Sequence, residues 1–507
     1  MNILFIASEV APFAKTGGLA DVAGAMPKHL AEFGHKVHLV MPLYRIVKES
    51  FPGLRPTERS ITVPVGQTDW HATIWTSKLP DSDVPICFLD QPCLYDREEL
   101  YGTYKTAGVE KGDYSDNCTR FTFLARGALE AAIALGLSPD VVHANDWQTG
   151  LVPVYIKTLY RAHPALANTG TVFTVHNLAY QGLFDRLDMT LTGLDWSLFN
   201  WRELEFFGKL NLLKGGLVFA DIINTVSSQY AKEIQTPDFG FGLDGVLRER
   251  SADLFGIING IDHSVWSPEV DELIPAKYGP DRPVGKATCK KELQRQSKLD
   301  IKSSPLLGMI SRLDNQKGFD ILALVVNKIL QHDVQFVLLG TGDKKYHELF
   351  EGLARRYPGK VGIHLTFNNQ LAHQIEAGAD IFLMPSRYEP CGLNQLYSLR
   401  YGTVPVVRRT GGLADTIVDV NENTLASGAA NGFSFDEYSG PALLKAVERA
   451  LELYKNRKAW KQLMLNGMRQ DWSWSRSAGE YAKLYQLAVL KRSQRNSAKS
   501  TGTPTKA

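Results

Sequence analysis

The six residues TGGLAD occur twice in this chain, each time directly after a basic residue, as KTGGLAD (15–21) and RTGGLAD (409–415). Apolar, strand-like runs precede both copies, NILFIAS (2–8) in the first half and VPVV (404–407) in the second. Two adjacent glycines after a strand let the backbone turn tightly and approach a ligand closely. Backbone N–H groups at the helix start that follows point at an anion. We therefore predict that each half aims a glycine loop and a cation at a negatively charged group; the alternative is that each copy is only a turn into a helix.

Apolar runs and helical patterns alternate along the chain in two successive blocks. Most of the runs are continuously apolar, as expected for parallel strands that are covered on both faces. Strand–helix alternation of this kind predicts an α/β protein with two Rossmann-like, doubly wound domains. The predicted strands are 3–7, 36–41, 84–89, 140–143, 171–175 and 222–226 in the first block, and 305–311, 334–340, 361–365, 380–385, 404–407 and 432–435 in the second.

A length of 507 residues also favours two large domains over one. The strand periodicity lapses near NGIDHSVWSPEVDE (259–272), so we predict an N-terminal domain of residues 1–262 and a C-terminal domain of residues 263–475. A last helical stretch follows the second sheet. The polar tail 493–507 has few groups that can be buried and is predicted to be disordered.

The composition argues against several classes of protein. The formal net charge is +2, so no bulk field favours nucleic acid or an anionic membrane as a partner. No apolar run approaches the roughly 18 residues of a membrane span, and the N-terminus reads directly as a strand without a basic leader. Five cysteines without regular spacing argue against a disulfide framework and fit a reducing compartment, so we expect a cytoplasmic protein.

Other catalytic motifs fit the sequence poorly. The phosphate loop GxxxxGK[ST], the zinc motif HExxH and the nucleophile motif GxSxG do not occur. GTGDKK (340–345) lacks the third glycine of the dinucleotide fingerprint. The acidic pair Asp81 and Asp83 lies in a polar loop, where we expect solvated surface and not a metal site for a sugar nucleotide. The histidines show no metal-ligand spacing, and we expect no metal cofactor.

Polar residues follow several of the predicted strands. Taken alone, an Asp after a strand is more often a helix N-cap, and a His is more often hydrogen-bonded scaffolding. In an open parallel sheet, however, ligands bind beyond the carboxyl ends of the strands. The joint occurrence at that edge predicts a functional site. Its residues are His143, Asn145 and Asp146 in DVVHANDWQTGL, His176 and Asn177 in TVFTVHNLAYQG, Arg312 and Lys317 in LGMISRLDNQKGFD, where Gly318 lies near the next helix, and Glu389 in EPCGLNQL.

Seven motifs together resemble the bacterial glycogen synthase and plant starch synthase family, in order from about residue 2 to about residue 485. They are KTGGLADV, HANDWQTGL, TVHNLAYQG, NGIDHSVWSP, SRLDNQKG, EPCGLNQLY and TGGLADT. The resemblance implies the glycosyltransferase-B fold, two Rossmann-like domains with a cleft between them, and a last helix, 476–492, that crosses back to the first domain. It also implies transfer of glucose from ADP-glucose to the non-reducing end of an α-1,4-glucan, with retention and without a metal.

The resemblance also implies roles for individual residues. Lys15 and Gly18 correspond to the family's glycine loop near the donor phosphates, and Arg312 and Lys317 to the basic pair that neutralises the diphosphate and stabilises the departing ADP. Glu389, Asp146 and His176 correspond to residues around the transferred glucose. The further substrate-binding residues that it implies are Asp21, Tyr95, Asn177, Asn259, Cys391, Gly392, Gly411, Gly412 and Leu413, with Tyr95 and Asn177 on the acceptor side.

Two positions depart from wider patterns. Other members of this fold often carry a second Glu eight residues after the first, where this chain has Tyr397, as synthases of the family also do. Asn145 stands where members often carry a His, and a neutral amide cannot act as an acid. Retention could use a carboxylate nucleophile or a front-face substitution in which the leaving phosphate takes the acceptor proton, and we favour the second. A UDP-glucose-using relative and a catalytically silent glucan-binding protein remain alternatives, and association with polysaccharide granules stays open.

Overall fold

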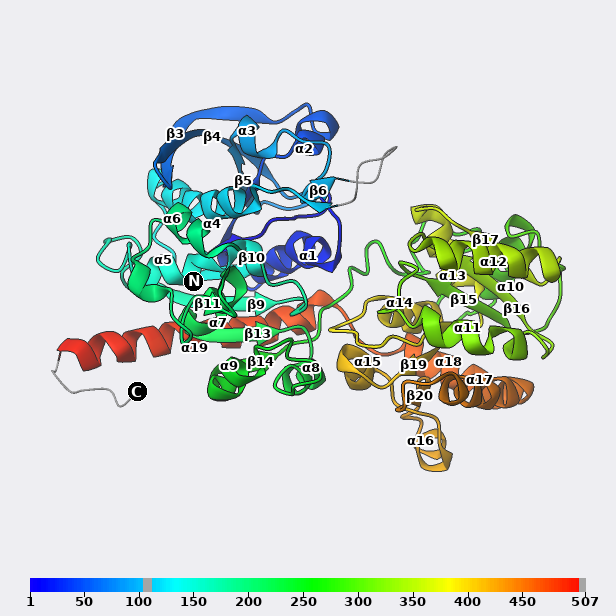
Figure 1. Ribbon diagram of the computed structural model, residues 1–507. Coiled ribbons are helices and arrows are strands. Elements are labelled where there is room, and N and C mark those ends of the chain that lie inside the picture. Colours follow the sequence, from blue (N-terminus) through cyan, green and yellow to red (C-terminus); the bar gives the residue numbers. More distant parts are fainter. Residues whose placement is uncertain (104–111, 501–507) are drawn as a thin grey trace. The chain divides into compact units, whose positions relative to one another are not determined.

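A computed structural model of the chain describes residues 1–103 and 112–500 (Figure 1). The chain forms two compact units. The first contains residues 1–226, 231–260 and the chain from Trp474 onward; the second contains residues 227–230 and 261–473. The division lies at Gly260–Ile261, two residues before the predicted one. No helix among the described residues is long and apolar enough to cross a membrane.

The first unit is built on a nine-stranded sheet with the order β14-β13-β9-β8-β1-β2-β5-β4-β3. The six predicted strands are all present as parallel strands. Their bounds are β1 Asn2–Ile6, β2 Lys36–Pro42, β5 Pro85–Asp90, β8 Val141–Asn145, β9 Gly170–Val175 and β13 Ile222–Thr225. Two short sheets accompany this one, formed by β6 Gly102–Thr103 with β7 Gly112–Asp113, and by β10 Leu183–Phe184, β12 Lys209–Asn211 and β11 Glu205–Phe206.

Three strands of the large sheet were missed by the sequence prediction. The strands β3 (Arg55–Val65) and β4 (Thr68–Lys78) form an antiparallel hairpin at one edge, and β14 (Leu254–Gly256) is the other edge. Edge strands are covered on fewer sides, and β3 accordingly mixes exposed and buried positions along its length. A search for continuous apolar runs therefore passes over them.

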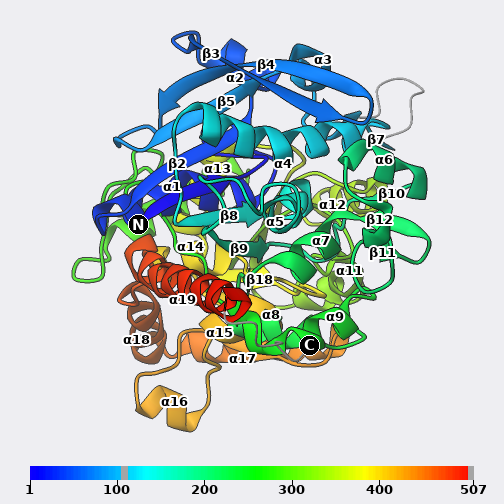
Figure 2. The same ribbon diagram turned by 90° about the vertical axis from the view of Figure 1, so that its left-hand side faces the viewer.

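Helices cover both faces of the large sheet. On one side α1 packs with α19 against the central strands, and on the other α4, α5 and α7 pack with one another (Figures 1 and 2). The helices of this part of the chain are α1 Gly18–Glu32, α2 Arg45–Ser50, α3 Pro92–Tyr95, α4 Asn117–Ala134, α5 Leu151–Lys157, α6 Met189–Thr192, α7 Leu212–Phe219, α8 Ser228–Glu233, α9 Asp244–Glu249 and α19 Trp474–Ser500.

The second unit is built on a six-stranded, all-parallel sheet with the order β17-β16-β15-β18-β19-β20. All six strands were predicted. They are β15 Leu306–Ile310, β16 Gln335–Leu339, β17 Val361–His364, β18 Ile381–Met384, β19 Val404–Arg408 and β20 Phe433–Phe435. The helices are α10 Gly285–Gln296, α11 Phe319–Ile329, α12 Lys344–Arg356, α13 Asn369–Gly378, α14 Asn394–Tyr401, α15 Gly411–Thr416, α16 Glu422–Ala426, α17 Gly440–Lys455 and α18 Arg457–Met468.

The continuous apolar runs of this unit serve two separate cores. Successive side chains of a strand point to opposite faces of the sheet. In β18, Ile381 and Leu383 join the core under α11, α12 and α17, whereas Phe382 and Met384 join the core under α13 and α14. Both faces are therefore apolar, which is why the strands read as uninterrupted runs.

The last helix, α19, is fixed to the first unit through buried polar contacts. His143, in the middle of β8, is hydrogen-bonded to Tyr485 at 2.8 Å and to Thr174 at 2.7 Å, and Asn224 donates to the hydroxyl of Tyr481 at 2.9 Å. Burial lowers the pKa of His143 to about 3, so the ring stays neutral. His143 thus belongs to the scaffold and not to a site.

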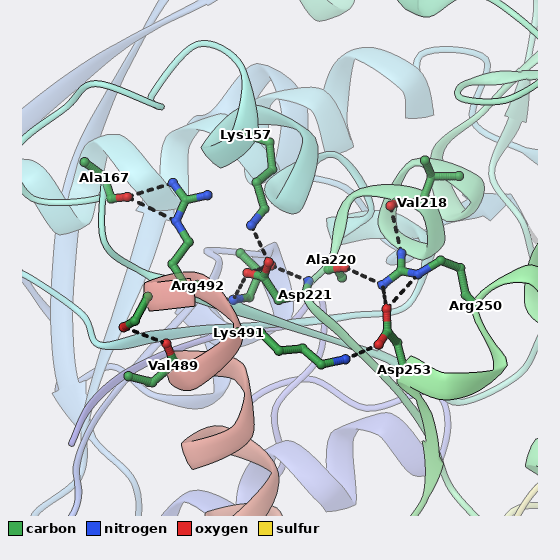
Figure 3. Close-up of polar contacts among 12 residues, drawn as sticks. Lys157, Ala167, Val218, Ala220, Asp221, Arg250, Asp253, Val489, Lys491 and Arg492 are labelled. Atoms are coloured by element: carbon green, nitrogen blue, oxygen red, sulfur yellow. Dashed lines mark hydrogen bonds and ion pairs between the residues drawn. The ribbon is translucent and has the colours of Figure 1, made fainter. Parts of the chain in front are cut away.

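Figure 3 shows how α19 is held near its far end. The Lys491 ammonium pairs with Asp253, and the Arg492 guanidinium donates to the carbonyl of Ala167 at 2.7 and 3.1 Å. The helix then continues to Ser500. The predicted disorder of 493–507 is therefore wrong for residues 493–500, because extending an existing helix is easier than starting one; residues 501–507 lie outside the described part of the chain.

Asp221 ties the start of β13 to β9 and α5. Its carboxylate, with no exposed surface, pairs with Lys157 at 2.5 Å and accepts from the backbone and hydroxyl of Thr171 at 3.0 and 2.8 Å (Figure 3). Asp221→Ala removes the carboxylate that pairs with a largely buried ammonium, so we expect a loss of about 3 kcal/mol in the free energy of unfolding of the first unit. Urea unfolding measures this. Asp83→Ala, which breaks an exposed pair with Lys78, is the control and should change little; equal losses would contradict the account.

Candidate active site

Each sheet contains one point at which the strand order reverses direction. In the second unit this point lies between β15 and β18, and in the first it lies between β1 and β8. Crevices that bind ligands form at such points, beyond the carboxyl ends of the strands. Of the polar residues predicted from the sequence, Asp146 follows β8, Arg312 and Lys317 follow β15, and Glu389 follows β18. His176 and Asn177 follow the neighbouring strand β9, and His143 and Asn145 lie within β8.

In the second unit an ion pair joins the two segments at the reversal point. The ammonium of Lys317, which follows β15, lies 3.0 and 2.7 Å from the two carboxylate oxygens of Glu389, which follows β18. The hydroxyl of Ser386 also donates to this carboxylate at 3.0 Å. Glu389 exposes only 8% of its side chain, whereas Lys317 exposes 20%. A nearly buried carboxylate is therefore held by a cation that is itself accessible.

Arg312 lies on the same segment as Lys317 and is more exposed, at 58% of its side chain. It pairs with Asp314 at 3.5 Å and donates to the side chain of Gln316 at 3.3 Å. Asp314 also accepts from the backbone amide of Lys317 at 3.0 Å, which fixes the turn between the two cations. The segment thus presents two positive charges at the carboxyl end of β15.

Close backbone packing brings the two segments together. Gly318 adopts a φ of 80°, and a Cβ at this position would lie 2.0 Å from the carbonyl oxygen of Pro385. Only glycine fits both requirements. Gly318, the neighbour of Lys317, thus packs against Pro385, four residues before Glu389.

The two copies of TGGLAD do different things. Gly411 and Gly412 pack on the backbone around Glu389: a Cβ on either would lie 2.0 Å from a carbonyl oxygen, that of Glu389 or of Cys391. The amide of Gly412 donates to the carbonyls of residues 389 and 390, and the amide of Leu413 donates to Thr410. In this structure the amide of Gly412 is used by the 389–391 loop and the amide of Leu413 by Thr410. The contacts predicted for Gly411, Gly412 and Leu413 with the donor stay predictions.

In the first copy the two glycines are open. A Cβ on Gly17 or Gly18 would meet no atom within 4 Å. Gly18 is also the first residue of α1, where backbone N–H groups lack intrahelical acceptors. Lys15 precedes them, half exposed, with its ammonium 2.6 Å from Asp21. This copy keeps the properties predicted for a loop that a ligand approaches closely.

Glu9 is a buried carboxylate beneath this loop that the sequence prediction missed. It accepts from the amide and hydroxyl of Thr16 at 2.5 and 2.6 Å, from the amide of Gly17 at 3.3 Å and from the hydroxyl of Tyr101 at 2.6 Å. Glu9 therefore fixes the shape of the loop and occupies two of its amides. No motif includes Glu9, and its only sequence signal is an acid at the end of the apolar run 2–8.

Asp146, directly after β8, has a strained backbone with φ 56° and ψ −179°. Few residues other than glycine adopt this conformation, and such strain gathers at functional sites. The carboxylate accepts from the amide of His176 at 2.7 Å. Burial raises the pKa of Asp146 to about 7, and the charge of Glu9 adds to the rise while the amides of residues 176 and 177 oppose it. Asp146 can therefore exchange a proton near neutral pH.

Asn145 fixes the ring of His176. Its amide nitrogen donates to the carbonyl of Ile6 at 3.1 Å, which turns its oxygen toward His176 Nε2 at 3.0 Å. The proton of the ring then sits on Nε2, which leaves Nδ1 as an acceptor. Burial lowers the pKa of His176 to about 3, so the imidazole is neutral. His176 is arranged to form hydrogen bonds and not to carry charge.

Comparison with known proteins bears on the function of the residues described in each unit. Residues 2–249 match the model of the starch synthase catalytic domain, and residues 290–463 match that of glycosyl transferases group 1. The chain is 48% identical to a glycogen synthase of Koribacter versatilis over 96% of this chain and 98% of that protein. It is 47% identical to a glycogen synthase of Thermosipho africanus over 97% of this chain and the whole of that protein. The chain belongs to the glycogen synthase family.

Solved structures agree with this assignment. The catalytic domain of starch synthase IV from Arabidopsis thaliana, determined with ADP and acarbose bound, superposes with a TM-score of 0.87 at 32% identity, over 96% of this chain and 99% of that one. A sucrose-phosphate synthase from Thermosynechococcus elongatus shares the fold, with a TM-score of 0.56 at 16% identity. The predicted family and the predicted glycosyltransferase-B fold are confirmed.

The remaining predicted residues fall into three groups. Tyr95 has no exposed surface and its hydroxyl donates to the carbonyl of Arg120 at 2.7 Å, so the prediction that it faces an acceptor is wrong here. The side-chain amide of Gln395 donates to the carbonyls of Cys391 and Gly392, and these bonds hold the loop that precedes α14. Asn177, half-buried beside His176, and Asn259, 4% exposed, stay predictions.

The raised pKa of Asp146 predicts how pH changes stability. The folded protein keeps this proton up to about pH 7, whereas the unfolded chain loses it near pH 4, so the stabilisation is lost as the pH rises through 7. Between about pH 5 and pH 8 we expect the wild type to lose on the order of 2–3 kcal/mol relative to Asp146→Asn, which cannot ionise. Urea unfolding of both proteins across this range measures the difference; parallel pH profiles would contradict it.

Proposed function

We propose that this chain transfers glucose from ADP-glucose to the non-reducing end of an α-1,4-glucan, with retention at the anomeric carbon and without a metal. Membership of the glycogen synthase family and the likeness to a starch synthase with bound ADP and acarbose support the donor and acceptor classes. The observation that carries the proposal is the nearly buried Glu389 carboxylate held by Lys317, with Arg312 on the same segment.

In the proposed step, the bond between glucose C1 and the β-phosphate oxygen of ADP breaks, and a bond from C1 to the acceptor O4 forms. The proton of the acceptor hydroxyl goes to the departing phosphate oxygen. Negative charge grows on the phosphate as the bond breaks, and Lys317 and Arg312 stabilise it where other transferases use a divalent ion.

Glu389 is assigned the orientation of the donor glucose and not nucleophilic attack. Both of its oxygens lie within hydrogen-bond distance of Lys317, and the hydroxyl of Ser386 adds a third hydrogen bond. A carboxylate whose lone pairs are occupied in this way is a poor nucleophile, which favours the front-face route over a covalent intermediate. Its charge is placed to stabilise the positive character that develops on the sugar ring.

The first unit is assigned the acceptor side and part of the donor. Lys15 and Gly18 are proposed to approach the phosphates, and Asp21, Asp146, His176 and Asn177 to bind sugar hydroxyls. The neutral His176 suits this role because it offers hydrogen bonds to an uncharged substrate.

A donor panel tests the proposed activity. Purified protein with glycogen should transfer glucose from ADP-glucose at least about tenfold faster than from UDP- or GDP-glucose, and exhaustive chelation with EDTA should leave the rate unchanged because the two cations are part of the chain. Faster transfer from UDP-glucose would favour the UDP-using alternative. Loss of activity with EDTA and recovery with Mg²⁺ would overturn the metal-free mechanism, and no transfer from any donor would favour the silent glucan-binding alternative.

Glu389→Gln separates a role in the reaction from a role in nucleotide binding. We expect kcat to fall by about a hundredfold or more, because a charge that acts in the transition state is lost. The affinity for ADP should stay the same or rise, since the variant frees the Lys317 ammonium for phosphate. Rate measurements and ADP titration calorimetry check both parts. Glu351→Gln, on the exposed surface of α12, is the matched control. Near-normal turnover of Glu389→Gln would remove Glu389 from the catalytic residues.

A further inference from the structure

Two turns in the first unit contain a phenylalanine where the backbone disfavours one. The hairpin between β11 and β12 turns through Phe207 and Gly208, with φ of 49° and 80°, and a second turn runs through Phe241 and Gly242, with φ of 49° and 81°. Hairpin turns with positive φ at both positions strongly favour Asn-Gly. A bulky side chain at the first position carries a steric cost. The fold does not require phenylalanine at these two positions, so a function of the two side chains would explain the steric cost.

The two turns pack against each other and brace the ring of Phe207. The rings of Phe206 and Phe207 meet edge to face, with centroids 4.7 Å apart at 81°. A Cβ on Gly242 would lie 2.9 Å from the Phe206 ring and 3.4 Å from the Phe207 ring. Phe207 nevertheless exposes 84% of its surface, and Phe241 exposes 39%. Phe207 thus rests against Phe206 and the second turn on one side, while most of its surface faces water.

A buried lysine anchors this part of the chain. The ammonium of Lys214, on α7, donates to the carbonyl of Trp201 at 2.5 Å and to that of Glu205 at 2.6 Å. Lys214 is 3% exposed, whereas the side chain of Trp201 is 70% exposed. The loop that carries Trp201 and the strand that leads to Phe207 are therefore held by one group.

The same region continues into the candidate active site. Gln181 donates to the carbonyl of Phe241 at 3.0 Å and accepts from Asn211 on β12 at 2.8 Å. Gln181 follows His176 and Asn177 by a few residues, and the amide of Tyr180 donates to the carbonyl of Asn177. The turn that carries Phe241 and the strand that follows Phe207 are thus linked through Gln181 to the segment after β9.

We propose that Trp201, Phe207 and Phe241, here called the aromatic lobe, bind a glucan chain outside the reaction centre. The inference rests on the proposed function. A glucose ring presents C–H groups on its faces and carries no charge, so it packs on an exposed aromatic ring without needing an ion pair. A ring that already rests against neighbours on one side, as Phe207 does, loses less conformational freedom on binding than a free one. Holding one part of a branched polymer raises the concentration of its chain ends at the site next to the lobe.

Phe207→Asn provides a sharp test, because asparagine suits the turn and removes only the ring. Native electrophoresis in gels containing glycogen, without any nucleotide sugar, measures glucan affinity directly. We expect Phe207→Asn to weaken the affinity about threefold to tenfold, and further together with Trp201→Ser. Phe207→Trp keeps an aromatic face and should bind as the wild type does. Leu324→Asn, at a leucine 72% exposed on α11 of the second unit, is the matched control and should have no effect.

Two further measurements test the proposal: the KM for acceptors of different length, and retardation in gels that contain dextran in place of glycogen. The rise in KM caused by Phe207→Asn should be larger for glycogen than for maltotriose, which is too short to span both sites. Dextran gels should retard the wild type and Phe207→Asn equally. Unchanged retardation of the double variant in glycogen would overturn the proposal. Sedimentation velocity gives a second contradicting outcome. If Phe207→Asn changes the oligomeric state and keeps its affinity for glycogen, the lobe is a contact between copies of the chain and the proposal is overturned. A wild type that binds glycogen through Phe207 but transfers no glucose would overturn the proposed function and leave this site standing.

Discussion

The ion pair between Lys317 and Glu389 is the interaction on which the candidate site of the second unit depends. It joins residues 72 positions apart, at the ends of the two strands where the sheet order reverses. A carboxylate with so little exposed surface needs a charged partner, because the desolvation of an unpaired charge is expensive. Two glycine contacts make the pairing possible: Gly318 lets the first segment lie on Pro385, and Gly411 lies against the carbonyl of Glu389. The ion pair is thus the product of backbone packing as much as of charge.

The repeated TGGLAD shows that one sequence pattern can be used in two ways. In the second unit its glycines pack on the 389–391 loop and hold Glu389 in place. In the first unit the corresponding glycines stand open above Glu9, whose carboxylate fixes the loop from below. The difference lies in the neighbours: backbone carbonyls approach one copy, and an acid side chain approaches the other. A single copy of the motif therefore indicates a tight turn, and only its surroundings decide whether a ligand can reach it.

The sequence predicted most of the fold because the buried strands are apolar on both faces. Runs such as β8 and β18 are unmistakable, whereas β3 and β4 at a sheet edge are half exposed and were missed. The clustering of site residues followed from the topology, since parallel strands end at one edge. Contacts that depend on packing could not be predicted. Glu9 belongs to no motif, the burial of Tyr95 depends on α4, and the strain at Asp146 is a property of the backbone alone.

A double-mutant cycle tests most directly whether Lys317 and Glu389 act as one unit. The rates of glucose transfer would be measured for the wild type, Lys317→Met, Glu389→Gln and the double variant. If the pair works as a unit, the double variant loses about as much activity as the more severe single variant, because the second change removes nothing further. If the two losses multiply, the residues contribute independently, and the ion pair seen between them does not organise the site.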